Sequence, residues 1–438
     1  MKSGAHTVLI LVDALRWDYV SPVDTPFLQS LAESPNAFRG RTRETFGFQT
    51  RPAFFAGLYP ETSQICTMFV YSPDRSPFRL LQYYPGQFIK MLPKGKERIE
   101  SFVRRAIESR VRRRSQHSAV RYYATSVSIP LELLPAFDFG EQELPWIDDY
   151  EGAVSLFTVL KEHNFEWFYI GWPLITDCQS DGKMVQQCLH DVTAKHRFCY
   201  VHLSQLDALG HAHGPHSPQL KQGLNNIDDL IRELVTGLES KLSVRDLNLV
   251  IFGDHGMVMV RETVDLLAAL QDSEARLGTH YVVFLDSTMA RFWFFKEGMK
   301  SKVESILGQF KGKGHILGEE EMARYRVRFK NHRHWDLLWL ANEGVLIHPN
   351  FFHTGGNLPK GMHGYAPDLL DNQGYFLLHA PCVERKRGIG AVDLVDIFPT
   401  VLDLAELPIP ESNQGRSVLR WEKASEGLEQ AGGSGLHQ

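Results

Sequence analysis

Residues 248–256 read NLVIFGDHG, an apolar run that ends in an aspartate and a histidine. An unbroken apolar run is typical of a strand buried on both faces of a parallel sheet. Read alone, Asp254 and His255 are no more than a polar turn after that strand. A carboxylate and an imidazole are also zinc ligands, so the remaining sequence has to decide between a turn and half of a metal site.

Four further stretches show the same buried-strand pattern, and amphipathic helices lie between them. These strands are HTVLILVD (6–13), FEWFYIG (165–171), RFCYVHL (197–203) and GYFLLHA (374–380). The stretch TPFLQSLAES (25–34) starts with a Thr-Pro helix signal, and residues 220–238 carry apolar side chains at alternating 3- and 4-residue spacing. This alternation predicts an α/β fold with a largely parallel sheet, in which ligands bind beyond the carboxyl ends of the strands.

The composition is that of an ordinary globular protein and excludes several classes. The chain has 438 residues, 43% hydrophobic and 23% charged, with a formal net charge of −5, so no general nucleic-acid binding is expected. No stretch approaches the roughly 18 uninterrupted apolar residues of a membrane span, and no signal peptide is evident, so we expect a cytoplasmic protein. Five cysteines without a CxxC pair indicate reduced structural thiols rather than metal ligands.

Two segments interrupt the strand and helix pattern. One is proline-rich, aromatic and locally basic, and the other mixes aromatic strands with a charged stretch. We expect a catalytic core formed by residues 1–65, 151–258 and 351–425, a basic and aromatic insertion at 66–150, a cap subdomain at 259–350 and a disordered tail at 426–438.

Within the insertion, residues 90–114 form a basic amphipathic stretch with three interpretations. It is a solvated surface helix packed on the core, a segment that contacts an anionic membrane or lipid peripherally, or a contact for a polyanion. The neighbouring apolar residues favour the lipid interpretation over nucleic acid.

Acidic and histidine side chains follow the ends of the predicted strands. They are Asp13, Asp207, His211, Asp254, His255 and His363. Carboxylate and imidazole ligands without thiolate suit Zn²⁺, with Mn²⁺ as the alternative. Six ligands exceed the need of one tetrahedral ion with an open position, so the pattern predicts two divalent metal ions.

A hydroxyl nucleophile is available in RETFGFQTRPAFFAGLYPE (43–61). Thr45 or Thr50 precedes the apolar run PAFFAGL, for which we expect a helix whose amino end would favour a phosphate. A two-metal site can activate such a hydroxyl and clamp both oxygens of a phosphoryl displacement.

An ordered set of motifs resembles the nucleotide pyrophosphatase/phosphodiesterase branch of the alkaline phosphatase superfamily. The motifs are VDALRWDYV, TFGF with GLYPE, DALGHAHGP, DHGM, HGYAPD with GYFLLHAP, and a tail VDLVDIFPTVLDLAELPIP. The resemblance implies a three-layer α/β/α sandwich with an inserted cap and a bimetallic zinc site. One metal would bind Asp207, His211 and His363, and the other would bind Asp13, Asp254, His255 and the hydroxyl of Thr45.

The chain departs from this family pattern at two places. In the family, the nucleophile lies ten residues before the glycine of GLYP, a position that Gly47 holds in this chain. Because glycine cannot act as a nucleophile, we infer a two-residue insertion and prefer Thr45, with Thr50 as the alternative. The phosphate-binding asparagine expected near Met68 is missing, and Thr67, Gln49 or Arg51 would have to replace it.

We therefore expect a metal-dependent hydrolase that cleaves a phosphodiester or pyrophosphate bond through a covalent threonine intermediate. Its substrate would be a small phosphorylated molecule of the nucleotide or lipid-headgroup type, and no specific nucleic acid is expected as a partner. The alternatives are a phosphomonoesterase, a phosphonate hydrolase, a phosphoethanolamine-type transferase, or an inactive homologue that only binds. The absence of a CxPSR sequence disfavours a sulfatase.

Overall fold

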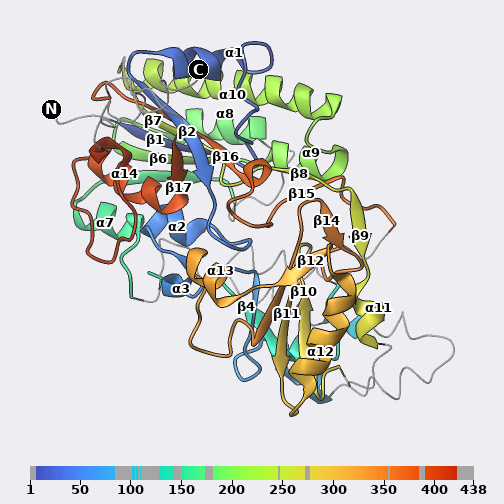
Figure 1. Cartoon of the computed structure of the whole chain (residues 1–438). Coiled ribbons are helices and arrows are strands. Elements are labelled where there is room, and N and C mark those ends of the chain that lie inside the picture. The colour runs from blue at the N-terminus through green and yellow to red at the C-terminus, as the bar shows by residue number, and fades with distance from the viewer. Residues whose placement is uncertain are drawn as a thin grey trace, which may run out of the picture.

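The computed structural model describes most of the chain (Figure 1). The described residues are 6–83, 101–103, 105–106, 109, 128–141, 149–150, 152–172, 181–244, 247–271, 277–353, 356–383 and 390–421. The predicted tail at 426–438 lies outside them, as does the stretch 90–114 except for residues 101–103, 105, 106 and 109.

A seven-stranded sheet forms the centre of the larger part of the molecule. Its order is β17-β2-β16-β7-β1-β6-β5. The strands are β1 (Thr7–Val12), β2 (Ala37–Arg43), β5 (Glu166–Ile170), β6 (His196–Leu203), β7 (Asn248–Phe252), β16 (Gly374–His379) and β17 (Ala391–Asp393). All five strands expected from the sequence are present, and the α/β fold with a mostly parallel sheet is confirmed.

One strand of this sheet runs against the others. Strand β1 is parallel to β6 and β7, but β16 is antiparallel to both β7 and β2. Strand β16 is therefore the exception within a sheet that is otherwise parallel. The reversal has a consequence for His363: because that residue precedes β16, the start of a reversed strand puts it at the same sheet edge as the carboxyl ends of β1, β6 and β7.

Helices cover both faces of the sheet (Figure 1). One face packs against α1 (Pro26–Glu33), α8 (Asp181–Asp191), α9 (Gln205–His213) and α10 (Pro218–Leu242), and the other against α2 (Arg51–Ala56), α7 (Leu156–Glu162) and α14 (Ile397–Leu404). Strand β1 contributes side chains to the hydrophobic cores on both faces of the sheet. Val8 and Ile10 pack toward the first set of helices, and Leu9 and Leu11 pack toward the second. The side-chain period of two explains why this strand is apolar throughout.

A second, smaller sheet lies within the range 259–350 expected for the cap subdomain, and we refer to this region as the cap. Its strands are β10 (Tyr281–Leu285), β11 (Met289–Phe294), β13 (Leu337–Ala341) and β12 (Gly314–Ile316), all antiparallel neighbours in that order. The helices α11 (Leu266–Gln271), α12 (Met299–Leu307) and α13 (Glu319–Arg324) belong to the same region (Figure 1).

Short elements connect these parts. The pairs are β3 (Phe69–Tyr71) with β4 (Phe137–Phe139), β8 (Val258–Met259) with β15 (Gly361–Met362), and β9 (Glu262–Val264) with β14 (Val345–Ile347). Helix α3 (Pro60–Ser63) and single 3₁₀ turns at 79–83, 134–136, 308–310, 370–372, 394–396 and 418–420 complete the description. Among the described residues, no helix has the length and apolar character needed to cross a bilayer.

The described part of the insertion shares a hydrophobic core with the cap. The rings of Phe69 and Phe137 lie 5.4 and 5.0 Å from the ring of Phe284. Arg291, fully buried in β11, donates to Asp286 at 2.9 Å and to the hydroxyl of Thr67 at 2.9 Å. The guanidinium therefore ties the cap to the start of the insertion.

Replacing Arg291 with alanine leaves the buried Asp286 carboxylate without its partner, which costs about 3–5 kcal/mol. We expect Arg291→Ala to lower the free energy of unfolding by that order, measured by urea denaturation. The control is Lys313→Ala in the same cap, because Lys313 and Glu262 form an ion pair whose side chains are 43% and 41% exposed. That exposed pair contributes less than about 1 kcal/mol. Equal losses in both variants would contradict the prediction.

Candidate metal centre and active-site cavity

A cavity of about 320 Å³ opens at the carboxyl edge of the central sheet. Its lining includes Asp13, Asp207, Asp254, His255 and His363. The structure thus brings side chains from four separate stretches of the sequence to one place, as ligand binding beyond the carboxyl ends of the strands predicts.

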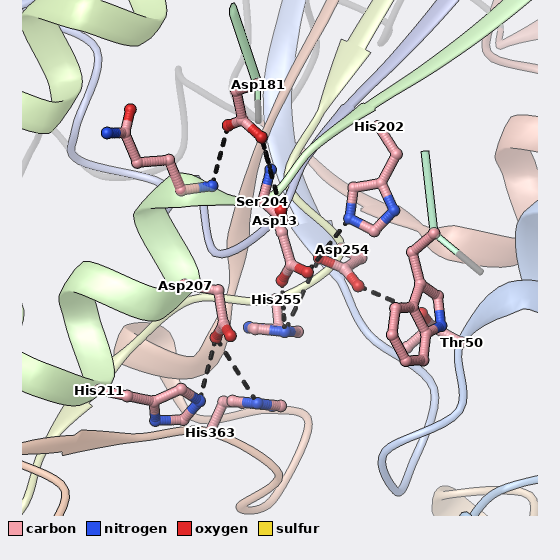
Figure 2. A network of polar contacts seen from close by, with 12 residues as sticks. Asp13, Thr50, Asp181, His202, Ser204, Asp207, His211, Asp254, His255 and His363 are labelled. Atoms are coloured by element: carbon pink, nitrogen blue, oxygen red, sulfur yellow. Dashed lines mark hydrogen bonds and ion pairs between the residues drawn. The ribbon is translucent and has the colours of Figure 1, made fainter. Parts of the chain in front are cut away.

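Helix α9 carries two candidate metal ligands, Asp207 and His211, on one face (Figure 2). Asp207 and His211 are one turn apart, and the Nε2 of His211 lies 3.1 Å from the Oδ1 of Asp207. The Nδ1 of His211 donates to the carbonyl oxygen of Gly361 at 2.9 Å, so Nδ1 carries a proton and Nε2, the nitrogen that faces Asp207, is the one left for a metal. This tautomer is the one that a metal-binding histidine needs.

Asp181 fixes the start of helix α9. Its carboxylate accepts hydrogen bonds from the backbone N–H groups of Ser204 and Gln205 at 3.1 and 2.9 Å (Figure 2). These N–H groups have no partner within the helix, and an acceptor there stabilises the first turn. Asp181 thereby holds the turn that carries Asp207.

Asp13 and His255 form the second group. The Nε2 of His255 lies 3.2 Å from the Oδ1 of Asp13 and 3.8 Å from the Oδ1 of Asp254. The Nδ1 of His255 donates to the carbonyl oxygen of Gly256 at 2.8 Å, so Nε2, the nitrogen that faces Asp13, is again the one left for a metal.

His363 lies between the two groups. Its ring stacks on that of His255 with centroids 3.6 Å apart and an interplanar angle of 3°, and its Nε2 is 3.8 Å from Asp207. Burial and the neighbouring His255 and His211 lower the pKa of His363 well below its ordinary value. A neutral imidazole is the form that binds metal.

The cavity residues fit a metal site by several criteria. Asp207, His211 and His363 offer ligand atoms within 4.8 Å of one another, and so do Asp13, Asp207 and His255. Among the described residues, the Oδ1 atoms of Asp13, Asp207 and Asp254 are buried without a hydrogen-bond partner. Buried carboxylate oxygens without partners are costly unless a cation neutralises them. The donor set of oxygen and imidazole nitrogen suits Zn²⁺ or Mn²⁺.

The carboxylates have different environments in the protein chain itself. Burial raises the pKa of Asp254 to about 6. Burial also opposes ionisation of Asp13, but contacts with His202 and His255 outweigh it and hold the pKa of Asp13 well below its ordinary value. Asp13 therefore remains charged across the physiological range.

The two candidate nucleophiles occupy different positions. Thr50 lines the cavity, and its hydroxyl donates to the Oδ2 of Asp254 at 3.3 Å (Figure 2). Thr45 is buried, at 5% exposure, and is not among the lining residues. Of the two candidates, Thr50 is therefore the one whose hydroxyl lies beside the candidate ligands, whereas the sequence favoured Thr45.

Thr50 also departs from the usual behaviour of its position. It is the N-cap residue of α2, the helix expected over PAFFAGL, yet its side chain makes no capping hydrogen bond. A threonine at an N-cap normally accepts from a backbone N–H of the first turn. Here the hydroxyl is used in the cavity instead.

Two lining residues escaped the sequence argument. His202, the penultimate residue of β6, contacts the Oδ2 of Asp13 at 3.2 Å. A polar residue near the carboxyl end of an otherwise apolar predicted strand was the available signal. Glu44 follows β2, which the sequence pattern did not reveal as a strand, and burial raises its pKa to about 8.

Of the three residues considered as replacements for the missing phosphate-binding asparagine, two line the cavity and one does not. Gln49 and Arg51 line the cavity. Thr67 does not, since its hydroxyl accepts from Arg291 and donates to the carbonyl oxygen of Phe69.

Known proteins resemble this chain in sequence. A family model described as type I phosphodiesterase/nucleotide pyrophosphatase matches residues 7–366. The chain is 25% identical over 222 residues to ectonucleotide pyrophosphatase/phosphodiesterase family member 7 of Mus musculus, which is 50% of each chain. It is 27% identical over 222 residues to bis(5'-adenosyl)-triphosphatase ENPP4 of Bos taurus, 50% of this chain and 46% of that protein. The chain thus spans about half the length of the curated relatives it matches.

Solved structures share the fold. One is murine ENPP5 in an inactive form, with threonine replaced by alanine, in complex with AMP. It superposes with a TM-score of 0.66 at 17% identity and covers 93% of this chain and 96% of that chain. Human ENPP5 has a TM-score of 0.65 at 18% identity and covers 92% and 96%. At such identities the likeness is one of fold.

The loop that carries Thr50 depends on Gly47, the residue ten positions before Gly57. Its φ is +109°, and a Cβ there would lie 2.0 Å from the carbonyl oxygen of Cys66. We expect Gly47→Ala to lower the free energy of unfolding by about 2 kcal/mol or more, measured by urea denaturation. Gly308→Ala is the control, because Gly308 has a φ of −58° and open space around its Cβ position. Equal stability of the Gly47→Ala variant and the parent protein would refute this account of the loop.

Proposed function

Because the chain belongs to the type I phosphodiesterase/nucleotide pyrophosphatase family, we propose that it is a metal-dependent hydrolase of phosphodiester or pyrophosphate bonds. The observation that carries the proposal is the placement of the Thr50 hydroxyl. It lies 3.3 Å from Asp254 in a cavity lined by buried carboxylates and histidines. A nucleophilic hydroxyl beside metal-ligand side chains is the arrangement that phosphoryl transfer through a covalent intermediate requires.

The candidate ligands divide into two sets of three side chains, one for each ion. Asp207, His211 and His363 would hold one divalent ion, and Asp13, Asp254 and His255 the other, with Zn²⁺ as the preferred metal. When bound, the two ions would lower the pKa of a coordinated hydroxyl and neutralise charge on the phosphoryl oxygens.

Thr50 then supplies the covalent step. The Thr50 hydroxyl gives up its proton to solvent, its oxygen attacks phosphorus and a bond forms between them. The bond from phosphorus to the leaving oxygen breaks as that oxygen departs with its electron pair and takes up a proton. Water later attacks the same phosphorus, and the bond to the Thr50 oxygen breaks to regenerate the hydroxyl. Asp254 orients the hydroxyl through its hydrogen bond, and His202 holds Asp13 in place.

The relatives support a nucleotide as substrate. One curated relative is a bis(5'-adenosyl)-triphosphatase, and a structural neighbour was solved in complex with AMP. In this chain Phe48, Phe54, Trp172 and Tyr200 line the cavity beside the candidate ligands. We propose a substrate in which a nucleoside monophosphate is joined to a phosphate or an alcohol, with aromatic contacts to its base.

The metal content provides a first test that needs no substrate. We expect the protein to bind two equivalents of zinc, measured by plasma mass spectrometry after dialysis. His211→Ala should reduce this to about one, because each ion has few other ligands. His190→Ala is the control, since His190 lies on α8 with a side chain 83% exposed. One equivalent or less in the parent protein would contradict the two-metal assignment.

The nucleophile is tested by three variants. Thr50→Ala should reduce kcat on bis-p-nitrophenyl phosphate by at least about 10³-fold while zinc content stays the same. Thr50→Ser keeps a hydroxyl and should retain measurable turnover, and Thr45→Ala should stay near the parent rate. Full activity of Thr50→Ala, or a loss confined to Thr45→Ala, would transfer the role to Thr45. A faster reaction of the parent protein with p-nitrophenyl phosphate than with the diester would favour a phosphomonoesterase.

A further inference from the structure

The cavity holds one strongly basic side chain, and its surroundings differ from those of an ordinary ion pair. Among the described residues that line the cavity, Arg51 is the single arginine or lysine. It follows Thr50 directly and is 8% exposed. A guanidinium so buried must have a defined partner on every face or a ligand to meet.

The partners of Arg51 occupy only part of the guanidinium. The Nε donates to the Oε2 of Glu141 at 2.8 Å, and Nη2 donates to the same carboxylate and to the Oε1 of Gln49 at 3.0 Å. No hydrogen bond of Nη1 to another described residue is present in the structure, and this nitrogen belongs to a side chain that lines the cavity.

Glu141 is itself anchored. It is buried, and its Oε1 accepts a hydrogen bond from the hydroxyl of Tyr150 at 3.2 Å. Glu141 lies two residues after β4, the strand that pairs with β3 in the insertion. A segment that interrupts the catalytic core thus reaches back to the residue next to Thr50.

We propose that Arg51 is the phosphate-binding group of this site, and that Glu141 is the residue that positions it. The ligand class is a phosphoryl group, whose non-bridging oxygen would accept from Nη1. The guanidinium would take the place of the side-chain amide that the sequence lacks after GLYPE. Arginine suits this task because its fork of donors can bind Glu141 on one edge and a phosphoryl oxygen on the other.

This assignment rests on the proposed function only in taking a phosphoryl group as the ligand. Gln49 presents its side-chain oxygen to Arg51 and so helps to orient the guanidinium. Thr67 is excluded by its engagement with Arg291.

The test compares two variants that both lack the Glu141 carboxylate. Removing Arg51 alone would leave a buried unpaired carboxylate and endanger folding. Glu141→Gln and the double variant Arg51→Met with Glu141→Gln avoid this problem and differ only at the guanidinium. Binding of inorganic phosphate to each zinc-loaded protein is measured by calorimetry, with thermal unfolding and zinc content as checks.

We expect the double variant to bind phosphate about 30-fold more weakly than Glu141→Gln, the effect of one charged hydrogen bond. Glu141→Gln itself should bind phosphate a few-fold more weakly than the parent protein, because its amide oxygen still accepts from Arg51 but holds the guanidinium less firmly than a carboxylate does. On bis-p-nitrophenyl phosphate the double variant should also lose kcat/KM relative to Glu141→Gln.

Equal phosphate affinity in the two variants would overturn the inference and leave the pair with a structural role. A larger loss in Gln49→Leu than in the double variant would also overturn it, because it would assign the contact to the amide. If no ester is hydrolysed by the parent protein, the proposed function fails, yet the phosphate comparison still decides the role of Arg51.

Discussion

The structure depends on burying several carboxylates at one edge of a sheet. Asp13, Asp207 and Asp254 each have an oxygen that is buried without a hydrogen-bond partner among the described residues. Such an arrangement is unfavourable for the protein chain alone, because like charges repel and desolvation penalises each of them. Histidines at 3–4 Å offset part of this penalty, and bound cations would offset the rest.

The backbone is organised to hold these groups against that penalty. Parallel strands end at the same edge, β16 runs in the opposite direction so that His363 arrives there too, and Asp181 caps the helix that carries Asp207. The close approach of Gly253 to the carbonyl oxygen of Leu15, where a Cβ would lie at 2.3 Å, lets the turn before Asp254 pack on the turn after β1.

The insertion and the cap pack against each other. The described part of the insertion packs on the cap through Phe69, Phe137 and the buried Arg291, and it also supplies Glu141 beside the cavity. Phosphoryl chemistry gains when charged groups are held rigidly near the reacting atoms, because no reorganisation is needed during the reaction. A segment far from Thr50 in the sequence therefore lies beside the same cavity.

The sequence by itself determined the fold class, all five strands first expected, and the candidate ligands, because unbroken apolar runs reveal buried strands and chemistry follows their ends. It did not determine that β16 is antiparallel, since strand direction leaves no trace in composition. It favoured Thr45 over Thr50 because Thr-Phe matches the family motif, and a motif does not reveal which hydroxyl of a loop faces a cavity. Only the tertiary structure placed Thr50 rather than Thr45 in the lining of the cavity. It also decided the contacts of His202 with Asp13 and of Arg51 with Glu141, since these pairs are brought together by packing between segments 189 and 90 residues apart.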